Sequence, residues 1–163
     1  MQTQEQLSQF LHQKFKVLIH KVTIETKALW GTMDAQRMLE HLAMGFKIAN
    51  GKIRIPESAI DVKSDKFKKL FLLSDRPLPR DFQNPIITAG LIPYEHESIE
   101  IAKLKLVEEI NAFRDYFTIK ADATCVHNLF GNLNYHEWLW FEYKHVMHHF
   151  MQFGIIPISD RIN

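Results

Sequence analysis

The sequence predicts an all-α protein, a bundle of three or four long helices with one extra short helix and one long proline-rich loop. Apolar residues recur in several long stretches at the spacing of an amphipathic helix. No two stretches show the convincing apolar–polar alternation that is typical of paired strands. The 163 residues contain no internal repeat and no shift in composition. We therefore expect a single helical-bundle domain that spans residues 1–163.

The first two helices are predicted from their apolar stripes. Residues 4–20 have apolar side chains at helical spacing, separated by Gln and Lys. Thr32 is a suitable N-cap for a second helix, which would run to about Ala49 because Asn50-Gly51 follows. His41 lies within or beside the apolar stripe of this second helix.

The middle of the chain contains a short helix, a loop and a long helix. We predict the short helix at residues 64–73, with Ser64 as its cap. Residues 75–93 contain four prolines and are too long for an ordinary bundle connection, so they either cover a site or form a surface excursion. Residues 94–117 have a continuous apolar face and predict a long helix, and residues 118–133 are expected to be irregular.

The last helix has clear ends. Asn134 is a good N-cap, and Glu137 stands at the position from which it can accept the N–H of the cap residue. Gly154 is suited to the position after the helix, and Pro157 follows it closely. We therefore predict one helix between Asn134 and Gly154.

The composition argues against several classes of function. The net charge of +1 gives no electrostatic reason to bind nucleic acid or an anionic membrane. No stretch of about 18 apolar residues could span a bilayer, and the N-terminus lacks the charged and apolar regions of a signal peptide. The single cysteine, Cys125, excludes an internal disulfide and is expected to be an inert thiol. We expect a cytoplasmic protein with no nucleic-acid or membrane partner.

Two histidines of the last helix suggest a metal site. His145 and His149 are four residues apart, which places both imidazoles on one face of the helix. Two such imidazoles can share a divalent metal ion, and His41 from another helix could supply a third ligand. The same pattern would arise if His41 were a core residue with a hydrogen-bond partner and the pair were there by chance. The spacing alone leaves both interpretations open.

Other polar residues of this region have more than one interpretation. His148 points about 100° away from His149 around the helix, so it could replace a ligand, contact substrate or pack at the surface. Glu142 precedes His145 by one turn and could orient its imidazole or be a solvated charge. His127 could be a turn residue or part of a pocket rim. The remaining histidines, which are expected to be solvated, are His12, His20, His96 and His136.

Three segments resemble those of a known family. Residues 30–42 are similar to the family's second-helix entry, where a Met-x-x-His-Leu-type sequence presents the first ligand. Residues 127–131 (His-Asn-Leu-Phe-Gly), followed by Glu137-Trp138, resemble the lead-in to the last helix. Residues 144–154 resemble the closing motif, His-x-x-x-His followed by x-x-Gln. On these segments the chain resembles the DinB-like (YfiT-like) superfamily of metal-dependent proteins, in an uncharacterised branch.

The resemblance implies a fold and a ligand set. The fold is a four-helix bundle with a metal site at one end, assembled as a homodimer. The ligands of the divalent metal, which could be zinc, nickel or iron, are His41, His145 and His149, and Gln152 matches the glutamine after the motif. Phe150-Met151 stands where the family commonly has Arg-Gly, so a role for that arginine is not carried over.

The resemblance also sets the expected function. We expect a metal-dependent enzyme that acts on a small molecule, by transfer of a low-molecular-weight thiol or by hydrolysis, with catalytic residues that the sequence does not identify. The alternative is a non-catalytic bundle, a binding or stress-associated protein whose histidines are structural or vestigial. DNA binding is a third hypothesis, which the balanced charge opposes.

Overall fold

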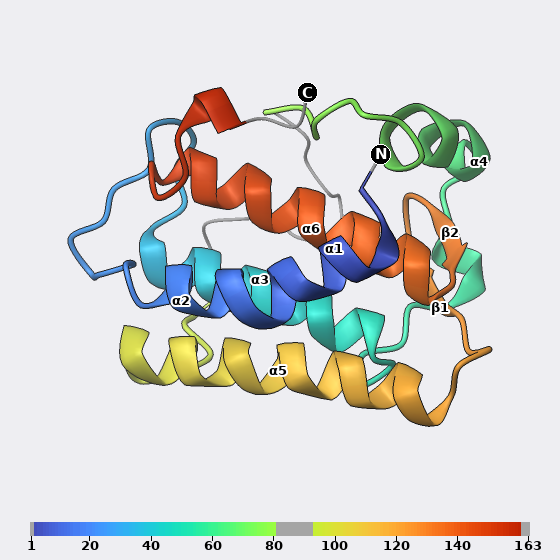
Figure 1. The fold of residues 1–163 in the computed structure, drawn as a ribbon, viewed down its shortest axis with the longest axis horizontal. Coiled ribbons are helices and arrows are strands. Elements are labelled where there is room, and N and C mark those ends of the chain that lie inside the picture. The colour runs from blue at the N-terminus through green and yellow to red at the C-terminus, as the bar shows by residue number, and fades with distance from the viewer. Residues whose placement is uncertain (1, 81–92, 161–163) are drawn as a thin grey trace.

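The structure is a computed structural model that describes residues 2–80 and 93–160. It is mostly helical and has one small antiparallel strand pair (Figure 1). The helices are α1 (Gln4–Gln9), α2 (Phe15–Ile19), α3 (Ala35–Ala49), α4 (Ser64–Phe67), α5 (Ile99–Ile119) and α6 (Tyr135–Gln152). Short 3₁₀ turns cover Glu57–Ala59 and Ile158–Asp160, and the strands are β1 (Cys125–His127) and β2 (Gly131–Leu133).

The first predicted helix is present, but it contains a π-helical segment that the sequence did not predict. α1 and α2 are joined by π turns at Phe10–Lys14, so the helical run extends from residue 4 to residue 19. Thr3 caps it in a capping box with Gln6. Residues at four-residue spacing on this run are fully buried, namely Leu7, Leu11, Phe15 and Ile19. This apolar face fixes the run against the core.

The predicted start of α3 is wrong by two residues. The N-cap is Asp34, whose side chain accepts the backbone N–H of Arg37 at 2.9 Å. Thr32 precedes the helix and does not cap it. A carboxylate at the N-cap also interacts favourably with the helix dipole. Asp34 therefore supplies both the cap hydrogen bond and a negative charge at the N-terminus of α3.

The predicted start of α5 is also too early. The cap is Ser98, whereas the sequence placed the start at Tyr94. The carboxylate of Glu40 on α3 accepts the backbone N–H groups of Glu95 and His96, at 3.0 and 3.1 Å. A contact with another helix thus holds this segment outside α5, because those N–H groups are bonded to a side chain.

The segment predicted as irregular contains the strand pair, so the expectation of no paired strands is wrong. β1 and β2 are antiparallel, with Val126 opposite Asn132, and Gly131 has φ of 71°. The indole N–H of Trp138 on α6 donates to the carbonyl of Cys125 at 3.1 Å. This bond attaches the hairpin to α6. Three residues per strand is too short for a visible alternation of apolar and polar residues.

The short helix is confirmed in position but not in detail. α4 is followed by π turns at Lys68–Leu72, and its N-cap position is Lys63, with no side-chain cap. Ser64 is the first helical residue, so its predicted capping role is wrong. In the predicted loop 75–93, residues 81–92 lie outside the described residues.

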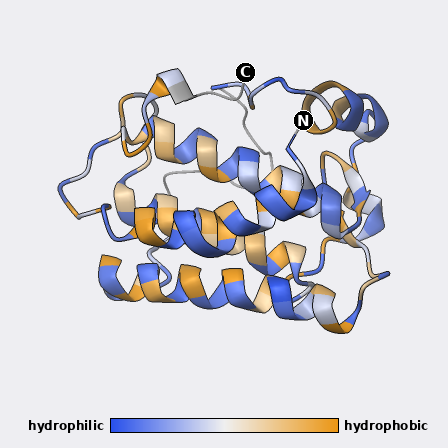
Figure 2. Cartoon of the chain, in the orientation of Figure 1, coloured by the Kyte–Doolittle hydropathy of each residue, from blue (hydrophilic) through white to orange (hydrophobic). Residues whose placement is uncertain are grey.

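The core lies between the long helices. α3 packs against α5 and α6, and α1 packs against α6 (Figure 1). Aromatic rings join these layers: the ring centres of Phe46 and Phe113 are 5.7 Å apart, and those of Phe15 and Phe150 are 4.8 Å apart. Hydrophobic and hydrophilic residues alternate around the helices (Figure 2). Among the described residues, no helix is both long and apolar enough to cross a membrane.

Candidate metal centre

α6 is the element that holds the centre. Its predicted ends are confirmed: Asn134 and Glu137 form a capping box, and Gly154 follows the helix with φ of 66°. The helix is buried on most of its faces, and residues on its side toward α3 include His145 and His149. A buried helix with fixed ends places these two imidazoles with little freedom.

Three imidazoles meet between α3 and α6. The Nε2 atoms of His41 and His145 are 2.8 Å apart. The ring centre of His41 lies 4.7 Å from that of His145 and 4.8 Å from that of His149, and the last two are 5.0 Å apart. One ring nitrogen from each lies within 4.8 Å of the others. The structure therefore brings together the three histidines that the sequence singled out.

Hydrogen bonds at Nδ1 set how His149 is protonated. Its Nδ1 is 2.8 Å from Oε1 of Gln152, and Nε2 of the same amide donates to the carbonyl of Trp30 at 2.8 Å. The Trp30 carbonyl fixes the orientation of the amide, so the Gln152 oxygen faces the imidazole. An amide oxygen only accepts, so Nδ1 of His149 carries the hydrogen. Its Nε2 then keeps the lone pair that a metal needs.

His145 has a carboxyl group in the matching place. Its Nδ1 is 3.4 Å from Oε2 of Glu142, which is completely buried. The other oxygen, Oε1, has no hydrogen-bond partner among the described residues. Burial raises the pKa of Glu142 well above its usual value. The prediction that Glu142 could be a solvated helix charge is wrong.

A glycine makes room for this pair. A Cβ atom on Gly45 of α3 would lie 3.0 Å from Oε1 of Glu142 and 3.3 Å from Nδ1 of His145. Any larger residue would push the carboxyl group or the imidazole aside. The sequence signal for this contact is a glycine inside an amphipathic helix, one turn after His41.

The three imidazoles are neutral near pH 7. Burial lowers the pKa of His41 to about 4, and it lowers the pKa values of His145 and His149 well below the ordinary value. The neighbouring imidazoles lower these pKa values further, because each would repel a charge on the others. Neutral imidazoles are the form that coordinates a metal ion.

His148 is not a member of this cluster of ring nitrogens. It is partly buried, and its ring centre lies 5.0 Å from that of His149 and 6.2 Å from that of Trp30. It therefore stands beside the centre on a neighbouring face of α6. Of its three predicted roles, replacement of a ligand does not fit this geometry.

The other histidines divide into buried and exposed ones. His127 is buried in β1, and its Nδ1 accepts the backbone N–H of Leu129 at 3.1 Å, so it is neither a turn residue nor part of an open rim. His12 and His96 are partly buried, which corrects the expectation that they are solvated, whereas His20 and His136 are exposed. Cys125 is buried, and burial raises its pKa, as expected for an inert thiol.

Comparisons of the chain with models of known protein families, with curated proteins and with solved structures give no match. The function is therefore inferred from the residues of this chain and their geometry.

Proposed function

We propose that His41, His145 and His149 bind one divalent metal ion, and that the chain is a metal-dependent enzyme with a DinB-like four-helix bundle. The observation that carries the proposal is the convergence of the three imidazoles, two of which have their Nδ1 atoms anchored by Glu142 and Gln152. The helical run 4–19, α3, α5 and α6 would be the four helices of the bundle.

The donor set agrees with a divalent transition metal. Neutral imidazoles suit zinc, nickel and iron, and three protein ligands leave coordination positions for water or substrate. Such an ion lowers the pKa of a bound water or thiol, or polarises an electrophile, which is the chemistry of hydrolysis and of thiol transfer. Each anchored imidazole would hold its Nε2 atom in place before the ion arrives, and this reduces the entropy lost on binding. We propose a small-molecule substrate, a low-molecular-weight thiol being one candidate, and a cytoplasmic homodimer.

The metal content of purified protein tests the site. Untagged wild-type protein should hold about one ion per chain, measured by mass spectrometry of the elements after extensive dialysis. His41→Ala, His145→Ala and His149→Ala should each hold almost none, because two imidazoles seldom retain an ion against a chelating buffer. His136→Ala is the matched control, since His136 lies on the same helix and is exposed. Undiminished metal in all three variants would show that the site is elsewhere.

Chelation tests the form of the non-catalytic alternative in which the histidines are vestigial and hold no metal. Removal of a bound ion from the wild type should lower its melting temperature, because the ion binds only the folded chain. If the wild type takes up no divalent metal and chelation leaves the melting temperature unchanged, the non-catalytic bundle is the better description.

A further inference from the structure

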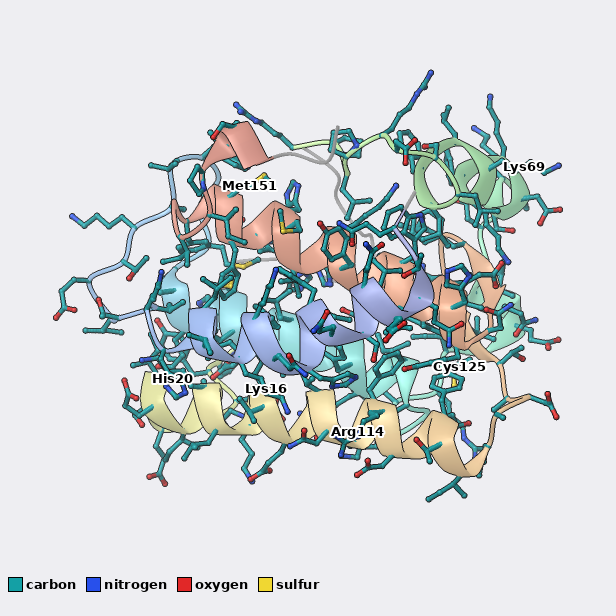
Figure 3. All side chains as sticks on the ribbon, in the orientation of Figure 1. Lys16, His20, Lys69, Arg114, Cys125 and Met151 are labelled. Atoms are coloured by element: carbon teal, nitrogen blue, oxygen red, sulfur yellow. The ribbon has the colours of Figure 1, made fainter. Side chains whose placement is uncertain are left out.

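A hollow lies beside the candidate centre, against the last turns of α6. It holds about 440 Å³ of space between atoms, part of which is open to solvent. Figure 3 labels one of its residues, Met151, near the C-terminal end of α6. The residues that matter for its chemistry are Trp30, Pro77, Arg80, Met147, His148 and Met151.

Lys144 fixes one wall of this hollow. It is almost fully buried, and its ammonium group donates to the backbone carbonyls of Phe71 at 2.6 Å, Arg76 at 2.9 Å and Ser74. Burial lowers its pKa to about 8, so the group is still charged at neutral pH, and its three protons match the three acceptors. The segment that leads into Pro77 is thereby bonded to α6. The wall is built by buried hydrogen bonds and not by surface packing alone.

The hollow shares its inner wall with the candidate centre. The ring of His148 faces the hollow and lies edge-on to that of His149, with ring centres 5.0 Å apart. Trp30, which also lines the hollow, accepts a hydrogen bond from Gln152, the residue that anchors His149. A small molecule in the hollow would therefore be separated from His149 by the side chain of His148.

The charge and surface of the hollow select its ligand. The guanidinium of Arg80 lies over the ring of Trp30, 4.5 Å from the ring centre. Arg80 is exposed, and no acidic residue is among the described residues that line the hollow. Met147 and Met151 supply polarisable sulfur atoms, which favour contact with aromatic rings.

We infer that this hollow binds the non-reacting part of the substrate, and that the substrate is a small organic acid with an apolar, aromatic body. Its carboxylate pairs with Arg80, whose plane is held by Trp30 and can donate two parallel hydrogen bonds. Its body lies on Met147 and Met151, and its other end extends past His148 toward the metal. This inference rests on the proposed function, which gives the other end something to react with.

A pair of probes with the same body tests the inference. These are 4-phenylbutyrate and the uncharged 4-phenylbutan-1-ol, titrated into protein labelled with carbon-13 at the methionine methyl groups. Both probes should shift the signals of Met147 and Met151, which Met→Leu variants assign. The acid should bind about tenfold more tightly than the alcohol, because charge-assisted hydrogen bonds are worth about 1.5–3 kcal/mol.

Variants of two exposed arginines locate the source of the preference. Arg80→Gln should abolish the tenfold preference for the acid and leave the affinity for the alcohol unchanged. Arg54→Gln is the matched control, since Arg54 is exposed but does not line this hollow, and it should keep the preference. Equal binding of acid and alcohol to the wild type would overturn the inference, as would shifts that spare Met147 and Met151.

Repeating the titration after chelation keeps the two proposals apart. No metal ligand lines the hollow, so the probe affinities should persist without metal. If the chain binds no metal but the acid still shifts Met147 and Met151, only the proposed function fails. If the three histidines bind metal and the acid binds no better than the alcohol, only the present inference fails.

Discussion

The free energy of unfolding of the metal-free protein should fall by several kcal/mol when the pH is lowered from 7 to 5. Burial lowers the pKa values of four histidines of the core, the half-buried His41 and the buried His127, His145 and His149, to about 4 for His41 and about 3 for His127. They stay neutral in the folded chain, whereas in the unfolded chain they take up protons as the pH falls below about 6.5. The unfolded state then binds more protons, so stability is lost as the pH falls.

The size of the effect is comparable to the whole stability of a small domain. Well below pH 6.5 each neutral histidine removes about 1.4 kcal/mol per pH unit, which is about 2 kcal/mol at pH 5. Glu142 acts in the opposite direction, because its raised pKa adds stability as the pH falls toward 4.5. It is one group against these four histidines and His12, whose pKa burial also lowers to about 4. Domains of this size are stable by about 5–15 kcal/mol. A large loss of stability between pH 7 and pH 5 is therefore expected.

Urea denaturation with a chelator, at pH 7, 6 and 5, measures this slope. His127→Gln should reduce the slope by about one histidine's share, about 1.4 kcal/mol per pH unit, since His127 is not a candidate ligand. His136→Gln is the matched control, because His136 is exposed on the surface of the fold. Equal free energies of unfolding at pH 7 and pH 5 would show that the buried histidines do not remain neutral in the fold.

Local signals predicted the ends of α6, whereas a contact between distant segments accounts for the error at the start of α5. Asn134 and Gly154 fix the ends of α6 through bonds within a few residues, so the sequence contains that information. The start of α5 depends on Glu40, which lies more than fifty residues earlier and holds Glu95 outside the helix. No local pattern reports such a bond.

The candidate centre was also predicted only in part, because some of its contacts depend on spacing within one helix and others on the packing of two helices. The spacing of His145 and His149 placed them on one face, and the apolar stripe of another helix offered His41 as a third ligand. The resemblance then selected His145 and His149 from the histidines of the last helix, and the structure brings all three together. The approach of Gly45 to Glu142 joins two helices and depends on their packing, which the spacing within either helix does not determine. Without that approach, a glutamate one turn before a histidine is equally suited to face solvent.

Glu142→Gln should weaken metal binding and, in the same protein, raise the stability of the metal-free fold. Removal of the partner of a ligating imidazole costs about 10–100-fold in metal affinity. With a metal ion bound, an ionised Glu142 would accept a stronger hydrogen bond from Nδ1 of His145 than a neutral amide would, so the amide would support the ligand less. The affinity can be measured by competition against a chromogenic chelator.

The gain in stability follows from the burial of the carboxyl group. The unfolded chain ionises Glu142 above about pH 4.5, whereas burial raises the pKa in the fold, so the residue lowers stability as the pH rises from 4.5 through the folded pKa. Glutamine has nearly the same shape and no charge, so metal-free Glu142→Gln should be more stable than the wild type at pH 7. Glu137→Gln is the control on the same helix, and it should lose stability because Glu137 completes the capping box and pairs with Lys68.

The opposite signs of the two effects are what make the prediction specific. A purely structural carboxyl group would give a change in stability without a change in metal affinity. A destabilised or rearranged helix would lower both. The third case is a buried carboxyl group that lowers the stability of the fold and also supports His145. Only in this case does its replacement give both weaker metal binding and a more stable metal-free protein. Unchanged metal affinity in Glu142→Gln would therefore contradict its role at the centre, even if the protein became more stable.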